Sequence, residues 1–248
     1  MSQCWKLLLA LALPCASHAQ LTVFTSGGFL TAYEELRPAF EKANSISITT
    51  LRGPSQGPGP TTIGAQLRKG VRADVVIMSR DGLDELAAEG RIAPGTKVNL
   101  ARVPLGLAVR AGAPRPDIST VEAFKQTLLR AKSIGVQSTS AIYMKERLLP
   151  RLGLTEEVVS KLNNGGATAI AAGETEMAVL PVSELLNRPG VDLIGTIPAE
   201  IQLVQVFSAA VLSNAKEPRL SKQFLLFLTS KDAHTAITRS GMEPLGSR

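Results

Sequence analysis

Apolar runs of the kind found in buried strands alternate along this chain with segments whose apolar residues recur at helical spacing. The run 75–78 (Val-Val-Ile-Met) is apolar throughout, which is typical of a parallel strand buried on both faces. Segment 29–43 places Tyr33, Leu36 and Phe40 on one face of a helix. The alternation predicts an α/β fold in which mostly parallel sheets are flanked by helices.

The same pattern gives two sets of strands and helices, the second inserted in the first. Strands are expected at 21–25, 46–51, 73–78, 134–137, 177–180 and 192–194, and longer extended stretches at 103–109 and 202–212. Helices are expected at 29–43, 63–69, 81–90, 120–131 after an N-cap at Ser119, 138–152, 155–162, 216–229 and 232–239. We therefore expect two lobes, one formed by 20–102 with 206–248 and the other by 103–205, with a ligand cleft between them.

The first nineteen residues have the pattern of a secretory signal peptide. Lys6 precedes the apolar run 7–13, and Ser-His-Ala at 17–19 supplies small residues for cleavage. The run is too short to span a bilayer as a helix. We expect cleavage after Ala19 and a periplasmic location for the remaining chain.

Composition narrows the chemistry further. Both cysteines, the one tryptophan and His18 lie in 1–19, so His234 is the only histidine of the remaining chain. A disulfide framework, a cysteine nucleophile and a Cys/His zinc site are therefore excluded. Aromatic residues make up only 4% of the chain, which disfavours a base-stacking surface for nucleic acid. The net charge of +6 is spread without a Lys/Arg run, and we expect a solvated surface that attracts small anions.

Small polar residues stand between a strand and a helix at three places, 25–28, 78–81 and 137–140. Free N–H groups at a helix start, together with nearby hydroxyls, can bind an anion without a formal positive charge. Ordinary N-capping by Ser and Thr is the alternative at each place. The candidate ligand-binding residues are Ser26, Gly27, Gly28, Gly53, Pro54, Ser55, Gln56, Ser79, Arg80, Ser138, Thr139, Ser140 and Tyr143.

Segment 53–57 matches G-x-S-x-G, the pattern of a hydrolase nucleophile. An elbow serine must lead directly into a helix, and 58–60 (Pro-Gly-Pro) prevents one here. We therefore interpret the segment as a rigid loop that presents Ser55 to a ligand. Nucleotide-binding glycine loops are absent, and Asp74 and Asp81 are expected to cap chain ends rather than hold a metal, so no cofactor is expected.

Several segments together resemble the periplasmic molybdate-binding protein superfamily. They are 21–40 (LTVFTSGGFLTAYEELRPAF), the loop at 53–55, 73–78 followed by 83–86 (Leu-Asp-Glu-Leu), and 109–119 (VRAGAPRPDIS). The resemblance covers nearly all of the chain after residue 19. It implies a type II periplasmic solute-binding fold and a small anionic ligand held by hydroxyls and backbone amides between two lobes.

The chain departs from molybdate binders at 26–29, at 53–56, and at 179–182, where the tyrosine usual in that family is replaced. In this it resembles a divergent branch that includes aconitate isomerase. Three functions stay open: a receptor for a di- or tricarboxylate, an aconitate isomerase that moves a proton allylically, and an oxyanion receptor for an ABC-type permease. The candidate bases are Ser26, Tyr143 and Asp81, and we expect a monomer with no nucleic-acid partner.

Overall fold

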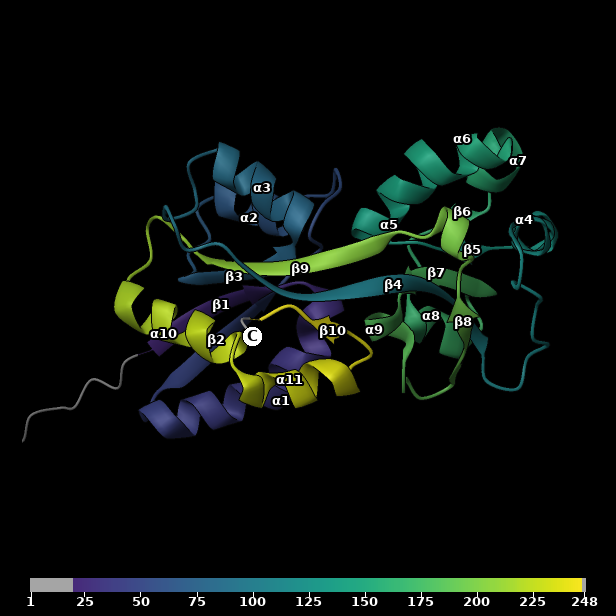
Figure 1. Cartoon of the computed structure of the whole chain (residues 1–248). Coiled ribbons are helices and arrows are strands. Elements are labelled where there is room, and N and C mark those ends of the chain that lie inside the picture. Colours follow the sequence, from purple (N-terminus) through teal and green to yellow (C-terminus); the bar gives the residue numbers. More distant parts are fainter. Residues whose placement is uncertain (1–19, 247–248) are drawn as a thin grey trace, which may run out of the picture.

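Two long antiparallel strands, β4 (Val98–Arg110) and β9 (Val204–Val211), cross the middle of the molecule and join its two lobes (Figure 1). The computed structural model describes residues 20–246, so the predicted signal peptide lies outside the described residues. Within 20–246, no helix is long and apolar enough to cross a membrane.

The first lobe is a sheet of strand order β2-β1-β3-β9-β4 covered by helices on both faces (Figure 1). Its other strands are β1 (Gln20–Thr25), β2 (Ser47–Arg52), β3 (Val75–Ser79) and β10 (Glu243–Pro244), which pairs with β4. One face carries α2 (Ile63–Arg68) and α3 (Arg80–Ala88), and the other carries α1 (Gly27–Asn44), α10 (Pro218–Leu228) and α11 (Lys231–Arg239).

The second lobe continues from β4 through the order β4-β7-β5-β6, with β8 also paired to β4. Its strands are β5 (Ile134–Gly135), β6 (Leu162–Asn163), β7 (Met177–Pro181) and β8 (Val191–Thr196). Its helical segments are α4 (Val121–Arg130), α5 (Ser138–Tyr143), the π-helical turn η1 (Met144–Leu148), α6 (Leu149–Leu152), α7 (Thr155–Val159), α8 (Ala167–Ala172), α9 (Val182–Leu185) and the 3-10 turn η2 (Ala199–Ile201).

The two-lobed α/β fold predicted from the pattern is confirmed, and its sheets are mixed rather than mostly parallel. β1 pairs in parallel with β2 and β3, and β5 pairs in parallel with β6 and β7. The antiparallel pairs all involve β4 or β9. Because the chain crosses once in each direction between the lobes, these two strands run oppositely and cannot both be parallel to their neighbours.

Short elements account for the differences from the predicted pattern. The helix expected over 155–162 ends at Val159, and Leu162 pairs with Ile134 as part of β6. Neither α8 nor α9 was predicted, because one or two turns are too short for helical periodicity to show. The N-cap of α4 is Thr120 rather than Ser119, since Thr120 Oγ1 accepts a hydrogen bond from the Ala123 N–H at 3.1 Å.

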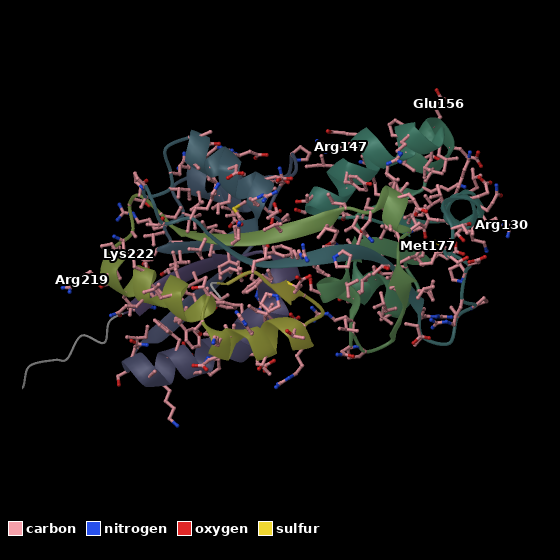
Figure 2. The ribbon with its side chains drawn as sticks, viewed as in Figure 1. Arg130, Arg147, Glu156, Met177, Arg219 and Lys222 are labelled. Carbon is pink, nitrogen blue, oxygen red and sulfur yellow. The ribbon has the colours of Figure 1, made fainter. Side chains whose placement is uncertain are left out.

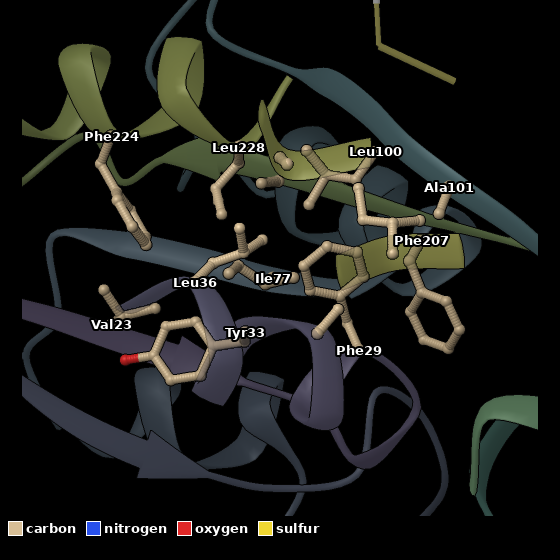
Figure 3. Close-up of a cluster of buried hydrophobic side chains, with 14 of the residues drawn as sticks. Val23, Phe29, Tyr33, Leu36, Ile77, Leu100, Ala101, Phe207, Phe224 and Leu228 are labelled. Atoms are coloured by element: carbon tan, nitrogen blue, oxygen red, sulfur yellow. The ribbon is translucent and has the colours of Figure 1, made fainter. Parts of the chain in front are cut away.

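An aromatic cluster fills the first lobe between the sheet and α1, α10 and α11 (Figure 3). The ring centroids of Phe29 in α1 and Phe207 in β9 lie 6.4 Å apart, and Tyr33 packs edge-on against Phe224 of α10. Phe207 is both a core residue and part of the wall of the cavity described below. The apolar core thus fixes the position of the α1 N-terminus relative to β9.

A substitution at Gly28 tests this packing, because a Cβ there would lie 2.0 Å from Phe207 Cζ. Alanine is the better helix former by about 1 kcal/mol, but the overlap forces a buried ring to move. We expect Gly28→Ala to lower the free energy of unfolding by about 1–3 kcal/mol, measured by urea denaturation.

Gly59→Ala is the matched control, since its Cβ would meet nothing closer than 3.9 Å. Its effect should stay within about 0.5 kcal/mol. Equal stability of the two variants would contradict the close contact between α1 and β9.

Candidate functional site

A cavity of about 280 Å³ lies where the strand ends of both lobes face each other. The ends of β1 and β2 in the first lobe and of β5, β6 and β7 in the second lobe form the wall of the cavity. Side chains of β9 line the wall between them. The residues that line it are Thr25, Ser26, Gly27, Gly28, Leu30, Arg52, Gly53, Pro54, Ser55, Gln137, Ser138, Thr139, Asn164, Pro181, Glu184, Gln205 and Phe207. Its volume suits a small metabolite.

The N-terminus of α1 presents unused donors to this cavity. Ser26 is the N-cap, with extended backbone angles, but its side chain does not cap the helix. Ser26 Oγ is buried without a hydrogen-bond partner among the described residues. Gly27 and Gly28 follow without side chains, so the first backbone N–H groups of an 18-residue helix are open to a ligand.

The loop after β2 forms the neighbouring wall. Gly53 N–H donates to Thr25 O at 3.3 Å, and the Ile63 N–H donates to Pro54 O at 3.0 Å, which holds the loop against β1 and α2. Ser55 is buried, and its Oγ accepts from the Ser79 N–H at 2.9 Å. The hydroxyl proton of Ser55 therefore stays available to a ligand.

Hydrogen bonds across the cleft hold the two lobes together beside the cavity. The Gln56 N–H donates to Ser138 Oγ at 3.0 Å, and Thr139 Oγ1 donates to Gln56 Oε1 at 2.9 Å. On another side, Arg188 Nη2 donates to Thr31 Oγ1 at 3.0 Å. Ser138 has a left-handed backbone (φ 50°), which is uncommon for a residue other than glycine and is found at functional sites.

Glu184 is the one carboxylate among the residues that line the cavity. It belongs to α9, directly after β7, and a Cβ on Gly27 would lie 3.3 Å from Glu184 Oε2. Burial raises the pKa of this carboxyl to about 7, against a smaller opposing effect of Arg188. Near neutral pH the group is therefore present in both protonation states.

Positive charge at the cavity is limited. Arg52 is the only cation that lines it within the described part of the chain, and its guanidinium also pairs with Glu34 at 2.7 Å while its side chain is largely exposed. The other lining groups that can donate hydrogen bonds are hydroxyls, amides and backbone N–H groups. Basic residues elsewhere, including Arg130, Arg147, Arg219 and Lys222, lie exposed on the outer surfaces of the two lobes (Figure 2).

Eight of the thirteen candidates from the sequence lie around the cavity, and five lie outside its lining. Those within it are Ser26, Gly27, Gly28, Gly53, Pro54, Ser55, Ser138 and Thr139. Gln56 lies beside it and makes the bonds between the lobes. Arg80 is exposed.

Three hydroxyl candidates outside the lining are used by the fold. Ser79 is buried as the N-cap of α3, where its Oγ accepts from the Gly82 N–H. Ser140 Oγ donates to Gln137 O at 2.7 Å within the first turn of α5. Tyr143 donates to Ile201 O at 2.7 Å and packs against the second-lobe core, so its hydroxyl is used within the fold and does not line the cavity.

Asp74 and Asp81, the two aspartates near the ends of β3, have structural partners or lie on the surface. Asp74 is buried and accepts from the backbone N–H groups of Thr22, Lys216 and Glu217, so it ties chain segments together. Asp81 is exposed in the first turn of α3. Over residues 20–246, no cluster of three potential metal ligands occurs. His234, on α11, does not line the cavity with Ser55.

Sequence reasoning missed several residues of the cavity wall, chiefly Gln137, Asn164, Glu184, Gln205 and Phe207. The end of β7 followed by α9 repeats the order of strand and then helix seen at the other loops, and that signal could have identified Glu184. No comparable signal exists for Gln205 and Phe207, which lie within a strand and reach the cavity because β9 passes beneath it.

The raised pKa of Glu184 predicts a pH-dependent stability. Its folded-state pKa lies above the usual value of 4.5, so the folded state binds more protons than the unfolded state between pH 4.5 and 7. Stability is therefore lost as pH rises through this window. Relative to Glu184→Gln, we expect the wild type to lose about 1–3 kcal/mol between pH 5 and pH 8, measured by denaturation in carboxylate-free buffer. A difference that does not change with pH would contradict the burial of this carboxyl.

Relatives and structural neighbours agree with this architecture. Residues 21–243 match the model of a family described as bacterial extracellular solute-binding protein. An aconitate isomerase from Pseudomonas sp is 37% identical over 230 residues, covering 91% of this chain and 88% of that protein.

Solved structures of low sequence identity share the fold. The periplasmic molybdate-binding protein of Azotobacter vinelandii superposes with a TM-score of 0.70 at 18% identity, over 90% of this chain and 98% of that one. A sulfate-binding protein from Mycobacterium tuberculosis superposes with a TM-score of 0.72 at 15% identity, over 92% and 88% of the two chains. This chain belongs to the bacterial extracellular solute-binding protein family.

Proposed function

We propose that this protein binds aconitate, or a closely similar di- or tricarboxylate, in the cavity between its lobes and interconverts cis- and trans-aconitate. The observation that carries the proposal is the convergence of neutral donors from both lobes on one small cavity. Unused N–H groups of α1 and the Ser26 hydroxyl, which has no partner among the described residues, meet there the hydroxyls of Ser55 and Ser138, each of which accepts a backbone N–H and keeps its own proton free. Such donors bind carboxylates by charge-assisted hydrogen bonds.

The similarity to an aconitate isomerase supports the choice of substrate. Its identity to this chain, 37%, extends over 91% of this chain and 88% of that protein. The structural neighbours named for molybdate and sulfate are much less similar in sequence and support the fold alone.

The proposed reaction moves one proton and one double bond. A C–H bond of the allylic methylene breaks, and its electron pair spreads over the three-carbon unit and the attached carboxylate. A proton then returns to the carbon at the far end, and the double bond shifts by one position. Atoms and electrons balance without an oxidant or a co-reactant, and donors at the cavity wall stabilise the developing negative charge.

A receptor role is the second candidate, favoured by membership of a family of solute-binding proteins. In that role the closed lobes would deliver a small anion to an ABC-type permease. For either role we propose a periplasmic location, in agreement with the predicted signal peptide, and a monomeric protein.

Purified protein without residues 1–19 should convert cis-aconitate into trans-aconitate, and the reverse, as followed by proton NMR. Both isomers should also raise the melting temperature in a thermal-shift screen that includes citrate, molybdate, tungstate and sulfate. Stabilisation by aconitate without interconversion would favour the receptor. Stabilisation by the oxyanions alone would overturn the carboxylate assignment.

Replacing Ser26 separates ligand binding from folding. Its hydroxyl has no protein partner among the described residues, so Ser26→Ala should leave stability unchanged or slightly raised. The dissociation constant for aconitate should rise about tenfold, from the loss of a hydrogen bond to a charged group. Isothermal titration calorimetry measures the change.

Ser55→Ala and Ser138→Ala should weaken binding and also lower stability, because each hydroxyl accepts a backbone N–H. Ser160→Ala, on the surface at the end of α7, is the control for both properties. Unchanged affinity in all three cavity variants would remove these hydroxyls from the ligand site.

A further inference from the structure

We propose that Glu184 is the catalytic base that removes the allylic proton and returns it to the far carbon. The inference rests on the proposed function and assigns the proton transfer to one residue. Glu184 is the only carboxylate among the cavity-lining residues, and it stands against the N-terminus of α1, where the ligand donors are gathered.

Its environment is unusual for a structural glutamate. Among the described residues no donor hydrogen-bonds its carboxyl oxygens, and no ion pair includes it. The nearby Arg188 instead donates from Nη2 to Thr31 Oγ1 and from Nε to the Glu184 backbone carbonyl. A half-buried carboxylate without such partners costs stability, and in a receptor it would also repel the anionic ligand. A function in proton transfer accounts for the presence of the destabilising Glu184 carboxylate.

The charged groups around Glu184 fit a base that works near neutral pH. Arg188 belongs to the same chain segment as Glu184. Arg52, which pairs with Glu34, lines the cavity from the end of β2. Glu174 lines a neighbouring recess that Glu184 and Arg188 also line. Burial dominates and raises the pKa of Glu184 to about 7. A group with that pKa is both a sufficient base and, once protonated, a sufficient acid at neutral pH.

The three bases considered from sequence are less suitable. The Tyr143 hydroxyl donates to Ile201 O outside the cavity, and Asp81 is exposed on α3. Ser26 faces the cavity, but among residues 20–246 no histidine lines it to act as a base for the serine. Ser26 and the α1 N–H groups are better placed as donors that hold the charge of the intermediate.

In the proposed step one Glu184 oxygen takes the proton from the allylic methylene, and the electron pair passes into the three-carbon unit and its carboxylate. The same carboxylic acid then gives its proton to the far carbon on the same face of the substrate. The double bond moves, and Glu184 is again ionised. Because one group carries the proton, part of the label from an allylic deuterium should appear at the far carbon rather than in water.

The test compares Glu184→Gln with Glu174→Gln, an exposed glutamate at the rim of the cleft. Glu184→Gln should lower kcat by at least about 100-fold, the usual contribution of general base catalysis. Its affinity for aconitate should be equal or higher, since a negative charge is removed. Glu174→Gln should keep both values near those of the wild type.

A merely structural role would show a different pattern, with lower melting temperature and weaker binding in Glu184→Gln. That pattern, or a Glu184→Gln variant that stays active, would overturn the assignment of Glu184 as the base. The proposed function would still stand as long as the wild type interconverts aconitate. Inactive wild-type protein would overturn both. The pH profile of the wild type tests the assignment even if the variant does not fold. The wild-type kcat/KM should rise about tenfold per pH unit below pH 7 and level off above it. A flat profile from pH 5 to 8.5 would contradict the assignment.

Discussion

The crossing of β4 and β9 is the constraint on which the rest of the structure depends. β4 pairs with β9 over 98–104 and with β7 and β8 over 105–110, so one continuous strand belongs to the sheets of both lobes. The sheets therefore cannot separate, and the ends of their parallel strands are held facing each other. A ligand site between the lobes follows from this connection, because loops and helix starts lie at those strand ends.

Two of the five buried polar side-chain atoms that have no hydrogen-bond partner among the described residues belong to residues that line the cavity. Buried polar groups are normally hydrogen-bonded, and Ser26 Oγ and Gln205 Oε1 are exceptions within the described part of the chain. Both residues line the cavity, where a bound anion or water can satisfy the serine and a ligand hydroxyl or water the amide oxygen. In the proposed function, binding would recover the stability lost by leaving these groups unpaired.

Closure and chemistry are linked through the same small set of loops. Gln56 bonds to Ser138 and Thr139 across the cleft, next to the loop that presents Ser55. Closing the lobes in this way removes water from a ligand and strengthens every electrostatic contact with it. Partial burial in the same part of the molecule raises the pKa of Glu184.

The sequence by itself determined the alternation of strands and helices, the two lobes and the polar loops at strand ends, because hydrophobic periodicity and helix starts are local properties. Only the tertiary structure decided which loops share a cavity. Ser26 and Ser79 stand in the same kind of loop and both are buried, yet Ser26 lines the cavity whereas Ser79 lies outside its lining and caps α3. Gln205 lies within a strand and joins the site through contacts far apart in the chain, and no local pattern encodes a distance of that kind.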